Sequence, residues 1–216
     1  MVQKYFAGTF KQRVRTFYGR NEGLEGKVKS LCALPEGLLA VTDKGIFSFD
    51  DGAFQRISPE TATGTYTCGD KTYICRENLL YELKNNSLAE AGEFDSRIIG
   101  VASDNMNIWL ATADRLYKSD GEKFVFYSNN DRSGMCLMTA FGNGRVYQSD
   151  GRNLAGLWGK RPRWGFISSE TSDLPSCSIT ALHADGIGSV WLGTDKGAYI
   201  FDGKCSWFGH NELDFL

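Results

Sequence analysis

The chain has 216 residues, with 24 Lys and Arg against 26 Asp and Glu, so its formal net charge at pH 7 is −2. This balance argues against a dedicated nucleic-acid or anionic-membrane binder, which would be strongly basic, and no apolar run approaches the roughly 18 residues that a transmembrane helix needs. The 25 Gly and the 5 Trp, 9 Tyr and 14 Phe fit an all-β chain with many tight turns, whereas only 2 His argue against His-based catalysis and His-rich metal sites.

In chain order, short apolar runs alternate with turns rich in Gly, Asp and Lys, a pattern typical of β-strands joined by hairpins. Residues 5–10 and 14–18 predict the third and fourth strands of a partial unit over 1–24. Full four-stranded units are expected at about 28–57, 65–94, 98–127, 135–167 and 179–208. The chain ends where the first strand of a further unit would begin, at Phe215 and Leu216.

Two sets of large residues mark the repeat. The second run of each unit contains an anchor: Leu39, Tyr73, Trp109, Tyr147 and Trp191. The third run contains a matching residue: Phe47, Tyr81, Tyr117, Ala155 and Tyr199. The two residues are eight apart in all five units, whereas the steps between units vary as 34, 36, 38 and 44. A constant spacing within the unit and a variable one between units predicts a rigid hairpin joined by loops of different length.

Four-stranded units of this length are blades of a β-propeller. A sandwich does not repeat at this period, and a helical repeat would show 3.6-residue periodicity. The sequence predicts a single all-β propeller domain over residues 1–216, with about six blades closed by joining the two chain ends. The alternative is a fragment of a seven-bladed or larger propeller.

The fifth unit carries a motif that reads Asp185-x-x-Gly188-x-Val190-Trp191-Leu192-Gly193-Thr194-x-x-Gly197-x-Tyr199. It resembles the D-x-x-G-x-l-W-x-G-T-x-x-G-l motif of two-component regulator propeller repeats. The Trp109 unit resembles it more loosely, since Ala111 and Arg115 replace two glycines.

The resemblance implies a propeller of the kind found as the extracytoplasmic sensor of hybrid histidine kinases, where it is linked to glycan sensing, or as an accessory domain of carbohydrate-active enzymes. The sequence has no kinase or receiver segment, so only a sensing or binding role carries over. The motif residues themselves look like scaffold: Gly for the turn, Trp for packing between blades and Thr for a turn hydrogen bond.

The turns between second and third strands each contain an acidic and a basic residue. They are Asp43 and Lys44, Arg76 and Glu77, Asp114 and Arg115, Asp150 and Arg152, and Asp195 and Lys196. In a propeller these turns share one face with the links between blades, so the five cations would gather on one rim. The rim would then bind anions or sugars, or its charges are ordinary solvated turn residues. His183, beside Asp185, either lines the channel and joins this site or stabilises a turn.

The six cysteines, Cys32, Cys68, Cys75, Cys136, Cys177 and Cys205, form no C-x-x-C pair and no zinc-type spacing with His. We therefore expect free thiols, no metal and no cofactor. Free thiols and a start without the apolar core of a signal peptide fit a cytoplasmic location for the chain as given. An extracytoplasmic location follows if it is part of a larger sensor.

Catalytic motifs are absent: the sequence contains no G-x-S-x-G, H-E-x-x-H or G-x-x-x-x-G-K-[ST]. We expect no catalytic residues and a non-catalytic module that binds a carbohydrate or protein partner on its rim, with oligomerisation through the chain ends open. One alternative is the propeller domain of a carbohydrate-active lyase or hydrolase, because the many Asp and Glu leave a carboxylate pair open. The other is a structural scaffold within a larger or oligomeric assembly.

Overall fold

A computed structural model describes residues 19–34, 37–104, 106–130, 134–142, 144–158, 163–185, 188–201 and 205–208. A single 3₁₀ turn, η1 (Arg20–Glu22), precedes the strands. No helix in this part of the chain is long and apolar enough to cross a membrane.

The strands form five antiparallel sheets of four strands each. Blade 1 consists of β1 (Val28–Leu34), β2 (Gly37–Thr42), β3 (Gly45–Asp50) and β4 (Ala53–Ser58). Blade 2 consists of β5 (Gly64–Cys68), β6 (Lys71–Arg76), β7 (Leu79–Lys84) and β8 (Ser87–Glu93). Blade 3 consists of β9 (Ile98–Ser103), β10 (Ile108–Thr112), β11 (Arg115–Ser119) and β12 (Phe124–Asn129). Blade 4 consists of β13 (Leu137–Phe141), β14 (Arg145–Ser149), β15 (Leu154–Trp158) and β16 (Arg163–Ile167). Blade 5 consists of β17 (Ile179–Ala184), β18 (Val190–Thr194), β19 (Gly197–Phe201) and β20 (Cys205–Phe208).

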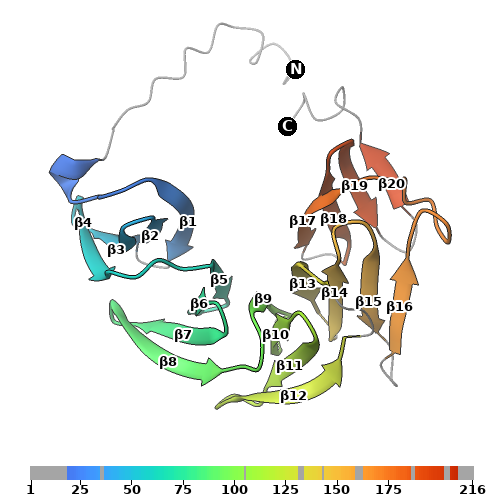
Figure 1. Ribbon diagram of the computed structural model, residues 1–216, viewed down its shortest axis with the longest axis horizontal. Helices are drawn as coiled ribbons and strands as arrows, with labels where there is room; N and C mark the ends of the chain where they lie inside the picture. The colour runs from blue at the N-terminus through green and yellow to red at the C-terminus, as the bar shows by residue number, and fades with distance from the viewer. Residues whose placement is uncertain are drawn as a thin grey trace, which may run out of the picture.

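Each blade is a meander whose first strand lies at the inside of the ring and whose fourth strand forms the outer edge (Figure 1). The inner strands β1, β5, β9, β13 and β17 follow one another along an arc in chain order (Figure 1). The predicted propeller of four-stranded antiparallel blades is therefore confirmed. The described strands make five blades rather than the expected six. The partial unit over 1–24 falls mostly on residues 1–18, and the chain end on 209–216, both outside the described residues.

The constant eight-residue spacing has a simple origin in strand register. In every blade the residue after the second-strand anchor lies opposite the third-strand anchor; the pairs are Ala40 with Phe47, Ile74 with Tyr81, Leu110 with Tyr117, Gln148 with Ala155, and Leu192 with Tyr199. Side chains alternate between the two faces of a strand, so a shift of one residue would exchange the two inter-blade faces. The shared register therefore gives all five blades the same pair of packing surfaces.

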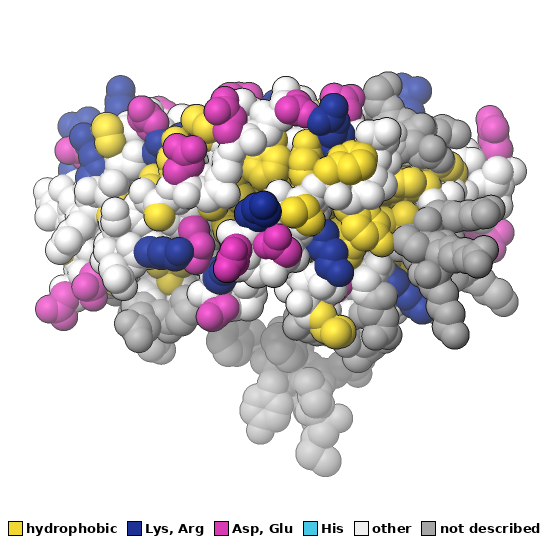
Figure 2. Space-filling model, turned by 90° about the horizontal axis from the view of Figure 1, so that it is seen from below, with side chains coloured by type: hydrophobic (Ala, Val, Ile, Leu, Met, Phe, Trp, Pro, Cys, Tyr) yellow, Lys and Arg dark blue, Asp and Glu magenta, His cyan; other side chains and the backbone are white. Residues whose placement is uncertain are grey.

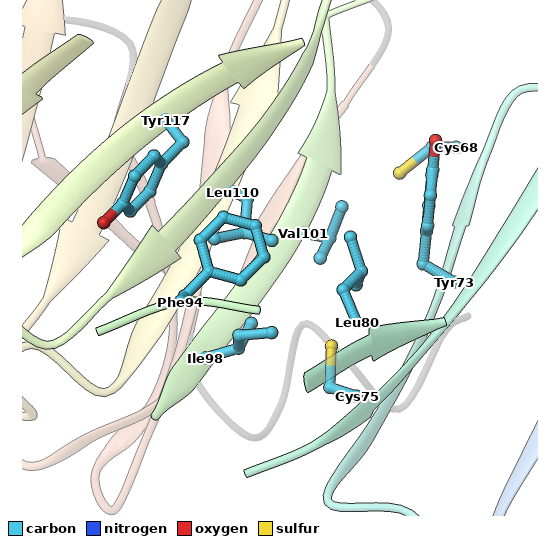
Figure 3. Close-up of a cluster of buried hydrophobic side chains, with 9 residues drawn as sticks. All are labelled: Cys68, Tyr73, Cys75, Leu80, Phe94, Ile98, Val101, Leu110 and Tyr117. Atoms are coloured by element: carbon cyan, nitrogen blue, oxygen red, sulfur yellow. The ribbon is translucent and has the colours of Figure 1, made fainter. Parts of the chain in front are cut away.

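The core lies between blades. Figure 3 shows the cluster between blades 2 and 3, where Tyr73 and Leu80 from blade 2 meet Val101 and Leu110 from blade 3. In the same way, Trp109 of blade 3 packs with Val146 of blade 4 and is only 2% exposed. The second-strand anchors of blades 1 to 4 thus face the following blade, and the predicted role of Trp in packing between blades is confirmed for Trp109.

The last anchor, Trp191 of β18, remains partly exposed. It corresponds to Trp109, but no described blade follows blade 5. At the other end of the arc, Leu31 of β1 is 60% exposed. The two end blades therefore each present an apolar surface that their counterparts within the arc bury.

Thr and Gly shape the turn between the second and third strands in blades 1 and 5. The Thr42 hydroxyl donates to the Gly45 carbonyl at 3.3 Å and accepts the Lys44 N–H at 3.0 Å; Thr194 makes the same two bonds in blade 5. Gly45 has φ +139°, and a Cβ there would lie 2.3 Å from the Ser58 carbonyl oxygen. Both the backbone conformation and the close approach of β4 therefore require glycine.

Candidate functional site

The turns between second and third strands and the links between blades lie together on one side of the ring, here called the turn face. Backbone hydrogen bonds join them: the Asp43 N–H donates to the Lys27 carbonyl at 3.2 Å, and the Asn130 N–H donates to the Asp114 carbonyl at 2.7 Å. The other two hairpins of each blade lie on the opposite face, because successive antiparallel strands reverse direction. The five rim cations therefore share one face of the ring.

Three of these cations bind to the link that precedes their own blade. Arg76 contacts Glu60 and the Ser58 hydroxyl, and its guanidinium lies 4.9 Å from the centre of the Tyr81 ring. Arg115 pairs with Asp95 of the β8–β9 link. Lys196 Nζ donates to the Ser176 carbonyl at 2.5 Å. These side chains hold links against turns, which is a structural use of their charge.

Lys44 and Arg152 differ from the other three. Both are exposed, and within the described part of the chain neither side chain has a hydrogen bond or an ion pair. Arg152 lies in the β14–β15 turn, where Asp150 accepts the backbone N–H groups of Arg152 and Asn153 at 2.8 and 2.7 Å. The turn is thereby fixed while the guanidinium remains available to a ligand.

A cavity of about 330 Å³ lies next to this turn. Asn153 and Phe166 line it together with Ser168, Glu170 and neighbouring residues of the β16–β17 link. The link is held in shape locally, since the Ser172 hydroxyl donates to the Ser168 carbonyl at 2.7 Å. Phe166, an amide, hydroxyls and a carboxylate thus line one opening, and its lining residue Asn153 directly follows Arg152 in the chain.

His183 and Asp185 lie at the end of blade 5 that is opposite to the turn face. Asp185 belongs to the β17–β18 turn and accepts the N–H groups of Gly188 and Ser189 at 2.9 Å each, as well as Trp191 Nε1 at 3.1 Å. His183 is exposed on β17, opposite Trp191 in the neighbouring strand. The structure does not bring these two residues together with the five cations of the turn face.

Blade 3 contains a close equivalent of Asp185 that the sequence reasoning missed. Asp104 is fully buried and accepts hydrogen bonds from the Met106 and Asn107 N–H groups at 3.0 and 2.7 Å and from Trp109 Nε1 at 2.9 Å. Burial alone would raise the pKa of this carboxyl, but the hydrogen bonds from Trp109, Asn107 and Met106 outweigh it and leave the pKa below its usual value. A sequence signal did exist: an Asp precedes the Trp by five residues in blade 3 and by six in blade 5.

The outer edge of blade 3 carries an exposed apolar strip. Val125, Phe126 and Tyr127 follow one another on β12 and are 39%, 56% and 37% exposed. Seen from this side, hydrophobic side chains gather along the middle of the edge, with charged residues above and below them (Figure 2). Apolar side chains grouped in this way are typical of a surface that contacts another protein.

Within the described residues, no group of three or more His, Cys, Asp or Glu side chains could hold a metal ion. Cys32, Cys68, Cys75, Cys136 and Cys177 are free thiols. Cys205 lies where the structure describes only the backbone.

Comparison with known proteins gives a match in fold. No protein-family model matches the sequence, and no curated protein sequence does. The extracellular domain of the putative one component system BT4673 from B. thetaiotaomicron has a TM-score of 0.65 and 15% identity, over 88% of this chain and 29% of that one. The extracellular domain of the putative hybrid two component system BT3049 from the same organism has a TM-score of 0.67 and 18% identity, over 86% of this chain and 30% of that one.

A third solved structure, the WD40 repeats of RRP9, has a TM-score of 0.64 and 10% identity, over 83% of this chain and 61% of that one. At these identities the likeness shows the fold, a β-propeller. The chain spans less than a third of the two bacterial extracellular domains. Extracellular domains of putative one component and hybrid two component systems and a WD40-repeat domain are thus all among its structural neighbours.

Proposed function

We propose that this chain is a non-catalytic binding or sensing module that recognises a carbohydrate or protein partner on its turn face, at Arg152 and the adjoining cavity. The observation that carries the proposal is the contrast among the rim cations. Arg76, Arg115 and Lys196 are used to hold links, whereas Arg152 is exposed and directly precedes Asn153, which lines a cavity together with Phe166. A guanidinium on the same turn as a residue that lines a cavity with an aromatic side chain suits a ligand that offers both acceptor oxygens and an apolar surface.

The fold shared with two extracellular domains of putative one component and hybrid two component systems supports the same assignment at the level of class. The extracellular domains of BT4673 and BT3049 share this fold, although each is more than three times as long as the part that this chain matches. Acidic residues described on the turn face, such as Glu60, Asp95 and Asp150, hold links and turns in place. This structural use of their carboxylates agrees with a binding role rather than a catalytic one.

The test is a glycan array probed with the wild-type chain and with Arg152→Ala. We expect binding that Arg152→Ala weakens at least tenfold, equivalent to the ~1.4 kcal/mol of one charge-assisted hydrogen bond. The matched control is Lys123→Ala, which removes an exposed cation from the β11–β12 turn on the opposite face. Equal binding by all three proteins would contradict the assignment, and turnover of a glycan would favour the lyase or hydrolase alternative.

The exposed strip on β12 supports a second candidate function, that of a scaffold that docks a protein partner. Among the described strands β12 is an outer strand that pairs only with β11, and Val125, Phe126 and Tyr127 give its edge an apolar surface. A partner could add a strand there and bury these side chains. Phe126→Lys should abolish such an interaction in a pull-down, while Arg152→Ala should leave it intact.

We also propose that a sixth blade, to which residues 1–24 contribute, completes the ring. The partly exposed Trp191 and the exposed Leu31 support it, since a neighbouring blade would cover both. The same surfaces would join two chains end to end in an oligomer. Light scattering after size exclusion distinguishes the two arrangements, because only the second doubles the mass.

A further inference from the structure

A second cavity, also of about 330 Å³, lies on the opposite face in the crevice between blades 1 and 2. Both blades line it: blade 1 contributes Leu34, Ser48 and Asp50 among others, and blade 2 contributes Asp70, Leu83 and Asn86 among others. Its volume is at the lower end of the roughly 300–1,000 Å³ of small-ligand sites. Neither the repeat motif nor the turn-face site accounts for this collection of side chains.

Two tight hairpins place the polar groups of the crevice. Asp51 and Gly52 connect β3 to β4 with φ of +50° and +85°, and Asn85 and Asn86 connect β7 to β8 with φ of +49° and +58°. Two central residues with positive φ define the type I′ turn, whose twist matches that of the flanking strands. Asp50 directly precedes the first turn and the two Asn form the second, so short hairpins rather than long loops fix their positions.

A hydrogen bond between the blades orients one of the amides. Ser48, only 3% exposed, donates its hydroxyl to Asn86 Oδ1 at 2.9 Å. Because the amide oxygen is occupied, the Nδ2 group of Asn86 keeps its two hydrogens for a ligand. Within the described chain this amide has no further partner.

The charges around the crevice select the ligand. Asp50 and Asp70 place two carboxylates on the lining, and no described Lys or Arg side chain lines it. The nearest lysines along the chain, Lys71 and Lys84, both pair with Glu82, at 4.0 and 3.1 Å. An anionic ligand would therefore meet uncompensated negative charge in this crevice.

We infer that the crevice binds a neutral saccharide. Such a ligand offers hydroxyl donors to Asp50 and Asp70, oxygen acceptors to the amide of Asn86, and a C–H face to the side chains of Leu34 and Leu83, which line the crevice and pack in the core between blades 1 and 2. A simple cation would satisfy the carboxylates but would leave the amide donors and the apolar wall unused. The inference rests on the proposed binding role of the chain but concerns the opposite face, so the two sites can be tested separately.

The experiment is saturation-transfer difference NMR with maltose, cellobiose and lactose as neutral probes, each at about 10 mM, which detects a Kd near 1 mM. A sulfated disaccharide and putrescine are the anionic and cationic comparators. The variants are Asp70→Asn, which keeps the shape of an exposed side chain but removes its charge, and Asn86→Gly, which removes the amide but tolerates the positive φ. Glu90→Gln removes an exposed carboxylate from β8, outside the crevice.

We expect signals from at least one neutral disaccharide, at least tenfold weaker binding in Asp70→Asn and in Asn86→Gly, and unchanged binding in Glu90→Gln and Arg152→Ala. If Asn86→Gly fails to fold, Asp70→Asn decides the outcome. The inference is overturned if none of the three neutral probes binds, if Asp70→Asn binds as well as the wild type, or if the sulfated disaccharide or putrescine binds more tightly. Binding lost in Arg152→Ala but kept in Asp70→Asn would refute the crevice and support the turn face.

Discussion

Replacing Trp109 by Phe tests whether the hydrogen bond between an indole and a buried carboxylate holds blade 3 together. The substitution keeps an aromatic ring against Val146 of blade 4 but removes the Nε1–H donor, which lies 2.9 Å from Asp104. A hydrogen bond to a charged group contributes about 1.5–3 kcal/mol, and the smaller ring adds a fraction for lost contacts. We expect Trp109→Phe to lower the free energy of unfolding by about 2–3 kcal/mol.

The matched control is Trp191→Phe in blade 5. It removes the same kind of bond, 3.1 Å long, between Trp191 Nε1 and Asp185. Trp191 is only partly buried, so water can replace the lost donor, and the expected cost falls to about 0.5–1 kcal/mol.

Both values are measured by urea unfolding, monitored by far-UV circular dichroism. The slope of the unfolding free energy against urea concentration should be the same in all variants, which checks that they unfold in the same transition. Combining Trp109→Phe with Asp104→Asn in a double-mutant cycle should give a coupling energy of about 1.5–3 kcal/mol. The reasoning is refuted if Trp109→Phe lies within about 0.5 kcal/mol of the wild type, or if Trp191→Phe costs as much.

Three further predictions concern the buried carboxylate of Asp104, two cysteines and two glycines. Because the pKa of Asp104 is lowered in the folded protein, its ionised form stabilises the fold above the pKa of about 3.9 in the unfolded chain, and this stability is lost as the pH falls through the folded pKa. Asp104→Asn should therefore show a smaller decrease of the urea midpoint below about pH 4 than the wild type. The same decrease in both proteins would contradict this. Exposed Cys136 should react with Ellman's reagent in the native protein, whereas burial raises the pKa of Cys75 to about 12 and should delay its reaction until unfolding; equal rates would be inconsistent with the burial of Cys75. Gly45→Ala should lower the free energy of unfolding by at least about 1–2 kcal/mol, because Gly45 has a positive φ and the position of its Cβ is blocked. A matched Gly52→Ala, whose Cβ would meet open space, should lower the melting temperature clearly less than Gly45→Ala in a thermal melt.

Much of the fold could be predicted because each blade repeats the same hairpin, and the residues that this hairpin requires therefore recur in the sequence. The Thr42 and Gly45 pair recurs as Thr194 and Gly197, and the eight-residue spacing reports a strand register. Such signals lie within one hairpin, where side-chain alternation and turn geometry leave few solutions.

The candidate site could be predicted only in part, because it depends on contacts between segments. Arg76 and Arg152 occupy equivalent turns, yet the first meets Glu60 of the preceding link and the second does not meet a comparable partner in the described chain. The crevice between blades 1 and 2 requires Asn86 to meet Ser48, 38 residues earlier, and no periodicity within either blade predicts that meeting. Asp185 and the rim residue Lys196 are separated by β18 and lie at its opposite ends, so the structure does not bring them to one face.

The direction in which the anchors point has a consequence for how such rings evolve. Because Tyr73, Trp109 and Tyr147 each face the next blade, every junction joins unlike surfaces, head to tail, and all junctions are alike. The geometry of one head-to-tail junction therefore does not by itself determine the number of blades. Duplication or deletion of one unit would keep this polarity at every junction, because the new junction would again join an anchor-bearing surface to the kind of surface that such anchors contact.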